Sequence, residues 1–123
     1  MNRILKKEIR NFKECASCAH TWKSREEFLE DPLIEIIGYQ ANFKHLELGI
    51  FLFNHHTCKS TLAVQVGEFK DLYDGPVYSE RLSRSDQCLD YCMNKDELRP
   101  CPQECECAYV REIIQTVKQW KSL

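Results

Sequence analysis

Cys15-Ala16-Ser17-Cys18 and His55-His56-Thr57-Cys58 are the two stretches of this sequence that decide how the chain folds. In each stretch, two residues separate a pair of metal-binding side chains, so both can face one ion from a single tight turn. Together they supply three thiols and an imidazole, a complete tetrahedral ligand set for zinc. The sequence therefore predicts one metal ion held by Cys15, Cys18, His55 and Cys58.

The histidine of this set has three candidates. His55 repeats the spacing of the first pair, whereas His56 lies two positions before Cys58 and would share one face of a strand with it. His20, two positions after Cys18, is the third candidate. We expect His55 to be the ligand, because its spacing to Cys58 matches the spacing of the two cysteines.

This pattern resembles the zinc-ribbon and treble-clef class of metal sites, in which a knuckle near the N-terminus meets a second knuckle on a hairpin. The resemblance covers the four ligand residues and the turns that carry them. It implies a structural zinc ion between a turn at residues 15–18 and a hairpin tip at residues 54–60.

The other five cysteines of the chain lie within twenty residues: Cys88, Cys92, Cys101, Cys105 and Cys107. The first two are four positions apart, as are the third and fourth, so each pair would share one face of a helix. Two such pairs resemble the twin-Cx3C proteins of the mitochondrial intermembrane space. That resemblance implies a helical hairpin with two disulfides.

The same five cysteines have other readings. Four of them, Cys88, Cys92, Cys101 and Cys105, could bind zinc or an iron–sulfur cluster, with Cys107 in place of Cys105 as a variant. A pair of them could cycle between thiols and a disulfide. Thiols without any bound group are the remaining alternative.

Length and composition bound the answer further. We expect a single domain over residues 1–123, with lobes 1–74 and 75–123 as its largest subdivision at the turn signal Asp74-Gly75-Pro76. In a chain this short, cross-links would add usefully to stability. The formal net charge of −2 gives no general case for a nucleic-acid partner.

The N-terminus and the apolar runs bear on location. Residues 1–8 have no apolar core of a signal peptide, and no apolar run reaches transmembrane length. We therefore expect a cytoplasmic protein. In that reducing compartment, closely spaced cysteines are more often metal ligands or catalytic thiols than structural disulfides.

The expected fold class is α+β: a small antiparallel sheet with flanking helices, a cysteine-rich segment and a long C-terminal amphipathic helix. Residues 2–14 and 24–30 are predicted to be helices, the second with Ser24 as its N-cap and Asp31-Pro32 as its end. Residues 33–69 are rich in strand formers and should hold the sheet. Apolar residues at three- and four-residue steps predict the C-terminal helix: Val110, Ile113, Ile114, Val117 and Trp120.

The motifs that accompany the cysteines bear on the class of function. His45-Leu46-Glu47 and Pro100-Cys101 only partly match the zinc-deaminase pattern, because three residues and not two separate Cys101 from Cys105. We expect a metal-stabilised interaction or sensing module without catalytic activity, with a protein partner. A homodimer through the C-terminal helix is a lesser alternative. The second function hypothesis is a redox protein, with an iron–sulfur cluster or a thiol/disulfide couple in residues 88–107.

Overall fold

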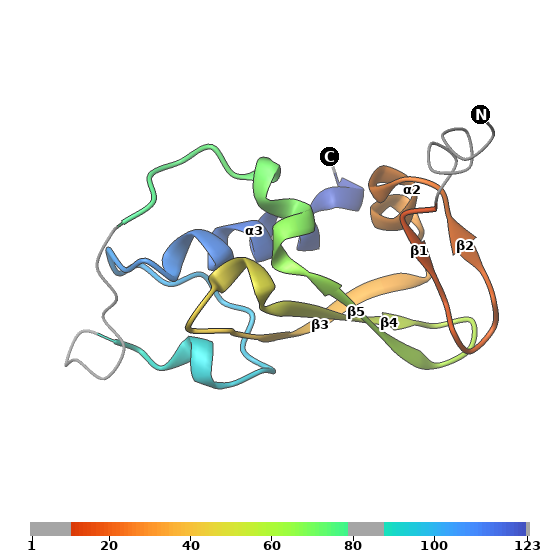
Figure 1. The fold of residues 1–123 in the computed structure, drawn as a ribbon, viewed down its shortest axis with the longest axis horizontal. Helices are drawn as coiled ribbons and strands as arrows, with labels where there is room; N and C mark the ends of the chain where they lie inside the picture. Colours follow the sequence, from red (N-terminus) through yellow and green to blue (C-terminus); the bar gives the residue numbers. More distant parts are fainter. Residues whose placement is uncertain (1–10, 79–87, 123) are drawn as a thin grey trace, which may run out of the picture.

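A small antiparallel sheet lies at the centre of the computed structural model, which describes residues 11–78 and 88–122 (Figure 1). Its strand order is β3-β4-β5. The strands span Ile34–Gln40, Ile50–His55 and Ser60–Gln65, respectively. The fold is therefore α+β, as the sequence predicts.

The remaining elements surround this sheet. A two-stranded ribbon, β1 (Lys13–Glu14) and β2 (Thr21–Trp22), precedes the short helix α2 (Arg25–Glu30). The long C-terminal helix is α3 (Ala108–Lys118). Four short 3-10 helices complete the described residues: η1 (Leu46–Leu48), η2 (Val66–Leu72), η3 (Tyr91–Met93) and η4 (Trp120–Ser122).

Side chains of β4 alternate between the core and the outside, as the period of two in a strand requires. Phe51 and Phe53 are almost fully buried, and they lie opposite Val64 and Leu62 of β5. Continuing the same alternation puts His55 on the buried face at the end of the strand, only 2% exposed. The strand that builds the core therefore also aims a histidine inward.

Helix α3 contacts β3 and η2 through the apolar stripe that the sequence predicts. Val110, Ile113 and Ile114 are fully buried, and Val117 is nearly so. Burial of each such side chain stabilises the fold by roughly 1.5–3 kcal/mol. Core packing is thus the use of this stripe.

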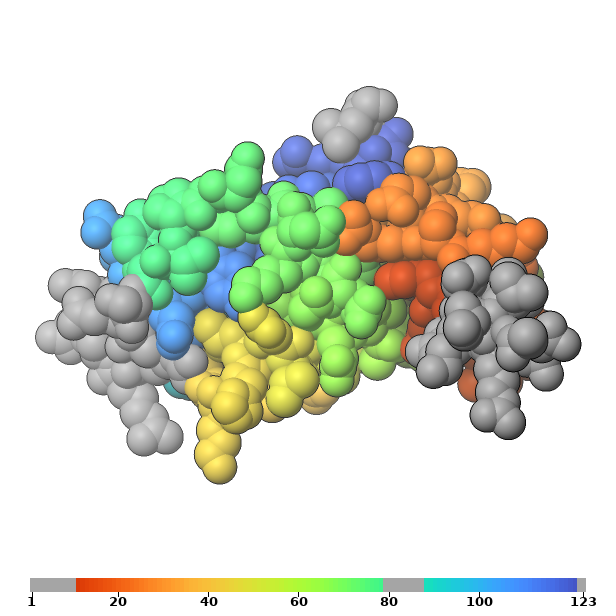
Figure 2. Space-filling model, turned by 45° about the horizontal axis from the view of Figure 1, so that its top comes forward, coloured from red at the N-terminus to blue at the C-terminus, as the bar shows by residue number. Residues whose placement is uncertain are grey.

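An arginine joins α2 to the helical turn that follows the sheet. The Arg25 guanidinium donates to both carboxylate oxygens of Asp71, at 2.5 and 3.1 Å, and to the Glu68 carbonyl at 3.0 Å. These contacts fix residues 25–30 beside η2, and the two segments lie next to each other on the face shown in Figure 2. Lys13 of β1 also donates to the Ala63 carbonyl of β5 at 2.9 Å, so the N-terminal part of the chain is held against both η2 and the sheet.

Glycine is required where the cysteine-rich segment meets β3. The Tyr39 amide donates to the Lys95 carbonyl at 2.8 Å, just after a register shift in β3. A Cβ at Gly38 would lie 2.9 Å from that carbonyl oxygen, closer than real Cβ contacts allow. The missing side chain lets the two backbones approach.

Several predicted elements are confirmed. The Ser24 side chain accepts from the Glu27 amide at 3.1 Å and caps α2, and the chain leaves the helix at Asp31. The predicted hairpin tip connects β4 to β5. No helix in the described parts of the chain is long and apolar enough to cross a bilayer.

Two predictions for residues 11–78 are wrong. Lys13–Glu14, expected in a helix, forms β1 because it pairs with β2 across the Cys15–His20 turn; residues 2–10 of that predicted helix lie outside the described residues. The strand expected from Leu46 begins at Ile50, after the turn η1. Division of the chain into lobes at residue 74 stays a prediction.

Candidate metal centre

Two turns of the same construction carry the predicted ligands. In the first, the Cys15 carbonyl accepts from the Ala19 amide at 2.8 Å, and Ala19 has a left-handed φ of 64°. In the second, the His55 carbonyl accepts from the Lys59 amide at 2.8 Å, and Lys59 has a left-handed φ of 59°. Each turn thus places its ligands at the first and fourth positions and reverses the chain at the fifth.

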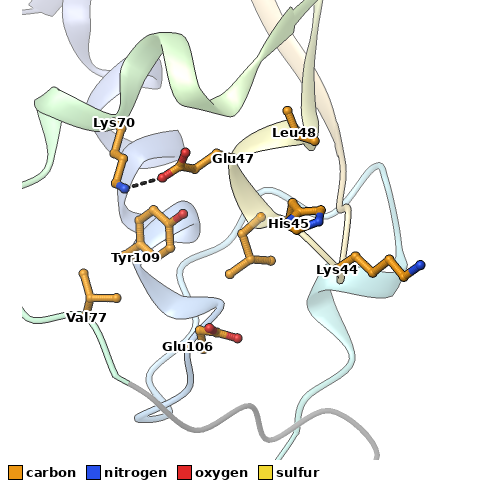
Figure 3. Close-up of a pocket in the computed structure, with 9 residues that line it drawn as sticks. Lys44, His45, Glu47, Leu48, Lys70, Val77, Glu106 and Tyr109 are labelled. Carbon is orange, nitrogen blue, oxygen red and sulfur yellow. Dashed lines mark hydrogen bonds and ion pairs between the residues drawn. The ribbon is translucent and has the colours of Figure 1, made fainter.

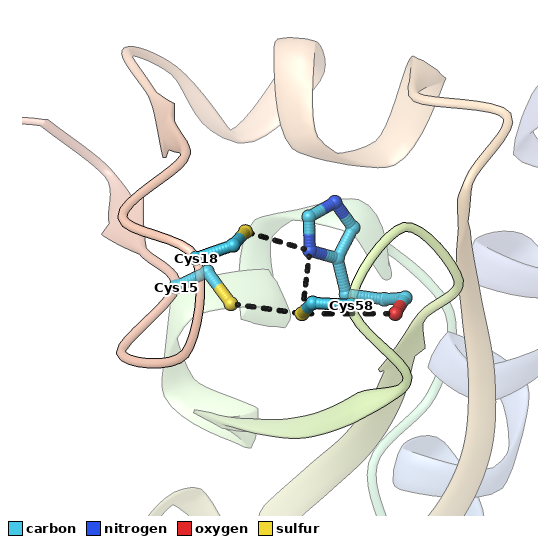
Figure 4. A group of neighbouring side chains, drawn as sticks. Cys15, Cys18 and Cys58 are labelled. Atoms are coloured by element: carbon cyan, nitrogen blue, oxygen red, sulfur yellow. Dashed lines mark hydrogen bonds between the residues drawn. The ribbon is translucent and has the colours of Figure 1, made fainter.

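The two turns bring four ligand atoms together (Figure 4). The sulfur atoms of Cys15 and Cys58 are 3.5 Å apart. Nδ1 of His55 lies 3.6 Å from the sulfur of Cys18 and 3.5 Å from that of Cys58. All four atoms lie within 4.8 Å of one another, so the predicted set is brought together in full. We call it the Cys3His site.

These distances match the edges of a zinc tetrahedron. With metal–sulfur bonds of about 2.3 Å and metal–nitrogen bonds of about 2.0–2.1 Å, tetrahedral angles put two sulfurs about 3.8 Å apart and a sulfur and a nitrogen about 3.6 Å apart. The observed separations of 3.5–3.6 Å are close to both values. In these three separations, the Cys3His site has the dimensions of a tetrahedral metal site.

The structure also resolves the choice among the histidines. His56, one position further along, faces the opposite way, and its Nε2 lies 3.0 Å from a Glu35 carboxylate oxygen. His20 packs against Trp22, with ring centroids 4.6 Å apart. Only His55 among the three belongs to the group of ligand atoms, because the alternation of β4 turns it inward.

The aromatic ring of Trp22 packs against the imidazole of His55. The Trp22 ring lies 5.1 Å from it, centroid to centroid, and Trp22 is itself held by a 2.9 Å hydrogen bond from Nε1 to the Asp31 carboxylate. Although burial of Asp31 opposes ionisation, the hydrogen bonds from Trp22 and the Leu33 amide lower the pKa of its carboxyl overall. Trp22 is therefore anchored by a charged acceptor and excludes water from one side of the site.

Ser60 is a site residue that the sequence analysis missed. Its hydroxyl oxygen lies 2.9 Å from the Cys58 sulfur and 3.4 Å from the Cys15 sulfur. This hydroxyl is the main reason why the pKa of Cys15 falls to about 5, even though burial of Cys15 acts in the opposite direction. The signal that could have found it is its place two residues after Cys58, at the start of a strand.

Cys18 is the exposed member of the set and has the opposite tendency. The His20 amide favours its thiolate, but loss of water and the neighbouring sulfurs of Cys15 and Cys58 raise its pKa overall. Thiolates this close repel one another, and a divalent cation among them removes that repulsion. Cys18 is exposed, so this side of the site faces the solvent.

Comparisons with protein-family models, with curated proteins and with solved structures give no match for this chain.

The five C-terminal cysteines line one cavity of about 20 Å³. We call it the five-cysteine pocket. In the part of the chain that the structure describes, Cys3His is the only group of three or more His, Cys, Asp or Glu with ligand atoms within 4.8 Å of one another. Metal binding by Cys88, Cys92, Cys101 and Cys105 therefore stays a prediction.

The helical hairpin that the twin-Cx3C resemblance implies does not form in this segment. Residues 88–107 contain one helical turn, η3, and are otherwise irregular. Asp90, between the first two cysteines, has a left-handed φ of 61°, which no helix accommodates. Pro100 and Pro102 flank Cys101 and lack the amides that a helix needs.

A larger hollow of about 820 Å³ lies elsewhere on the surface (Figure 3). Its charged groups include Glu47 and Lys70, which form an ion pair beside the Tyr109 ring. None of the residues that line it is a cysteine, and His45 reaches it from the start of η1. The Glu47 carboxylate is thus engaged by a cation, and the deaminase-like pattern does not form a site here.

Proposed function

We propose that this protein is a zinc-stabilised interaction module, in which one zinc ion in the Cys3His site ties the N-terminal ribbon to the central sheet. The observation that carries the proposal is the convergence of four ligand atoms, within 4.8 Å, from two turns of the same construction. Thiolate and imidazole ligands in a tetrahedron are the usual choice of zinc.

The ligand count supports a structural role for the ion. A catalytic zinc keeps one position open for water or substrate, whereas a structural zinc is closed by four protein ligands. The Cys3His site supplies four, and Ser60 and Trp22 pack around them. The proposed ion therefore has no position at which it would activate a substrate.

The small size of the β1–β2 ribbon supports a stabilising role for the ion. Strands β1 and β2 pair through two residues each. A two-stranded ribbon is marginal in water even when it is longer. Bonds from a metal ion to Cys15 and Cys18 on one side and to His55 and Cys58 on the other would fasten it to the β4–β5 hairpin.

The interaction role rests on the surface that remains. Exposed apolar side chains near the hollow of Figure 3, Leu48 and Val77, support a protein partner at that face. The apolar stripe of α3 is buried within the chain, so we place no homodimer interface on it. A cytoplasmic location belongs to the same proposal, because a reducing compartment keeps the ligand thiols available to the ion.

Adjacent histidines provide a matched test. Protein expressed without added metal is purified, and zinc is measured by elemental analysis for His55→Ala and His56→Ala beside the wild type. Wild type and His56→Ala should retain the zinc of the Cys3His site, and His55→Ala should lose it. Equal zinc content in the two variants would overturn the proposal.

A further inference from the structure

We propose that the five-cysteine pocket binds a second metal centre through thiolate ligands, independently of the Cys3His site. Cysteines make up five of the eleven residues that line this cavity. They come from the start of the second described segment and from the approach to α3, two stretches that the irregular backbone folds together. A volume of about 20 Å³ is what one water molecule or one ion needs.

Backbone amides point at two of these sulfurs. The Asp90 amide donates to the Cys88 sulfur at 3.4 Å, and the Cys107 amide donates to the Cys105 sulfur at 3.5 Å. In both cases the donor lies two residues after the cysteine, and the Cys88 sulfur also lies 3.6 Å from the Asp90 carboxylate. Hydrogen bonds to sulfur favour the thiolate, which is the form that binds metals.

A buried arginine beside the pocket would be stabilised by nearby negative charge. Arg111 is 0% exposed, and its guanidinium lies 5.6 Å from the centre of the Tyr91 ring, which lines the pocket. Nε and Nη2 donate to the carbonyls of Arg99 and Glu97 at 3.0 and 2.6 Å. Nη1 has no hydrogen-bond partner among the described residues.

No carboxylate in the described ranges forms an ion pair with Arg111. The closest candidate is Glu97, but its carboxylate pairs with Arg99 at 2.6 Å. A buried cation without a counter-charge is costly in a medium of low polarity. Arg111 therefore favours anions in its surroundings, and the cysteines are the groups there that could become anionic.

A thiolate metal centre supplies that charge. Four thiolates and one Zn²⁺ sum to a net charge of about −2, and four thiolates around a [4Fe–4S]²⁺ cluster sum to the same value. With neutral thiols, the negative charge near Arg111 would be that of the Glu97 carboxylate, which Arg99 already shares. The ligand chemistry common to both centres is four cysteine sulfurs, and the two differ in how far apart they hold them.

The cavity of about 20 Å³ has room for one ion, and a larger cluster would require the loops around it to move apart. No three of the five sulfurs lie within 4.8 Å of one another in the described chain, so they surround the cavity more loosely than the Cys3His ligands surround theirs. A zinc ion would draw the irregular loops inward, whereas a cubane cluster holds its thiolates farther apart. If iron is present, the centre makes this segment a redox site.

The test uses the full chain, purified under anaerobic conditions. Zinc, iron and acid-labile sulfide are measured in the wild type, in Cys101→Ser and in Cys18→Ser. We expect more metal in the wild type than one ion per chain. Cys101→Ser should lose the second centre and keep the Cys3His ion, and Cys18→Ser should show the reverse. Either iron with sulfide or a second zinc supports the proposal and identifies the centre.

The failures of the two proposals are distinguishable. If Cys101→Ser has the metal content of the wild type, the pocket binds no metal and the proposal is overturned, while the Cys3His site stands or falls with Cys18→Ser alone. Thiol counting on the denatured wild type guards against a variant that misfolds. Pocket thiols that react only after reduction are disulfides and overturn the proposal, whereas thiols that react after denaturation with chelator alone support it.

Discussion

Replacing Cys58 by serine should remove one of four ligands and a large part of the stability of this chain. Structural zinc contributes roughly 10–16 kcal/mol to folding in small peptides, which equals the whole stability of many domains, about 5–15 kcal/mol. Mutation of a residue that only supports a ligand already costs about 10–100-fold in metal affinity, or about 1.4–2.8 kcal/mol. Loss of the ligand itself should therefore exceed about 3 kcal/mol.

The structure indicates how this loss would appear. Cys58 contacts three partners at once, with the Cys15 sulfur, His55 Nδ1 and the Ser60 hydroxyl all within 3.5 Å of its sulfur. For a chain of this length, 1 kcal/mol corresponds to roughly 3–5 °C in Tm, so Cys58→Ser should melt at least about 10 °C lower than the wild type. Thermal unfolding followed by circular dichroism measures the shift.

Two controls make the result decisive. Ser17→Ala changes an exposed neighbour in the same turn and should melt with the wild type. A strong chelator should lower the Tm of the wild type towards that of Cys58→Ser and should change the variant much less. If Cys58→Ser melts with the wild type, or if the chelator affects both proteins equally, the ion does not stabilise the fold through this site.

Three further substitutions test single features. Ser60→Ala should raise the pKa of Cys15 above about 5, so protons compete better with the ion and zinc release on acidification, followed with a zinc indicator, should move to higher pH. Gly38→Ala should cost about 1–3 kcal/mol in chemical denaturation, because its new Cβ would meet the Lys95 carbonyl at 2.9 Å. Ser24→Ala should cost about 1 kcal/mol in the same assay through loss of the α2 cap.

Each of these has an outcome that would contradict it. An unchanged pH of zinc release would mean that the hydroxyl does not support the thiolates. Gly67→Ala is the matched control for the glycine, since its new Cβ would have contacts no closer than 3.4 Å, and equal losses in the two glycine variants would refute the steric argument. A Ser24→Thr variant keeps a capping oxygen and should retain most of the lost stability.

Features that depend on local periodicity could be predicted from the sequence. The apolar stripe of α3, the N-cap of α2 and the spacing of the ligands are each defined by residues close together in sequence. All three predictions are confirmed. The ligand spacing also favours His55 over His56, and in the structure His55 is the last, buried residue of β4 while His56 begins the turn.

Features that depend on contacts distant in sequence could not be predicted in this way. The four-residue ribbon β1–β2 has no pattern of its own, and its strands form where the first turn brings them together. The Cx3C spacing fits a helical face, but a left-handed Asp90 and two prolines prevent the helix. An arginine would be expected on the solvated face of α3. Arg111 is instead buried, because backbone carbonyls more than ten residues away accept hydrogen bonds from its guanidinium.

The close approach of Lys95 to Gly38 has a consequence for solubility. In the order β3-β4-β5, strand β3 is an edge, and an edge with free amides and carbonyls is a template on which a second copy can add a strand. On this edge, the Tyr39 amide already donates to the Lys95 carbonyl. Further along it, the Ile34 carbonyl accepts a hydrogen bond from the Lys121 ammonium at 2.9 Å. If the cysteine-rich segment became disordered, part of this edge would be uncovered. We therefore expect damage to the cysteine-rich segment to cause self-association of chains whose sheet is still folded.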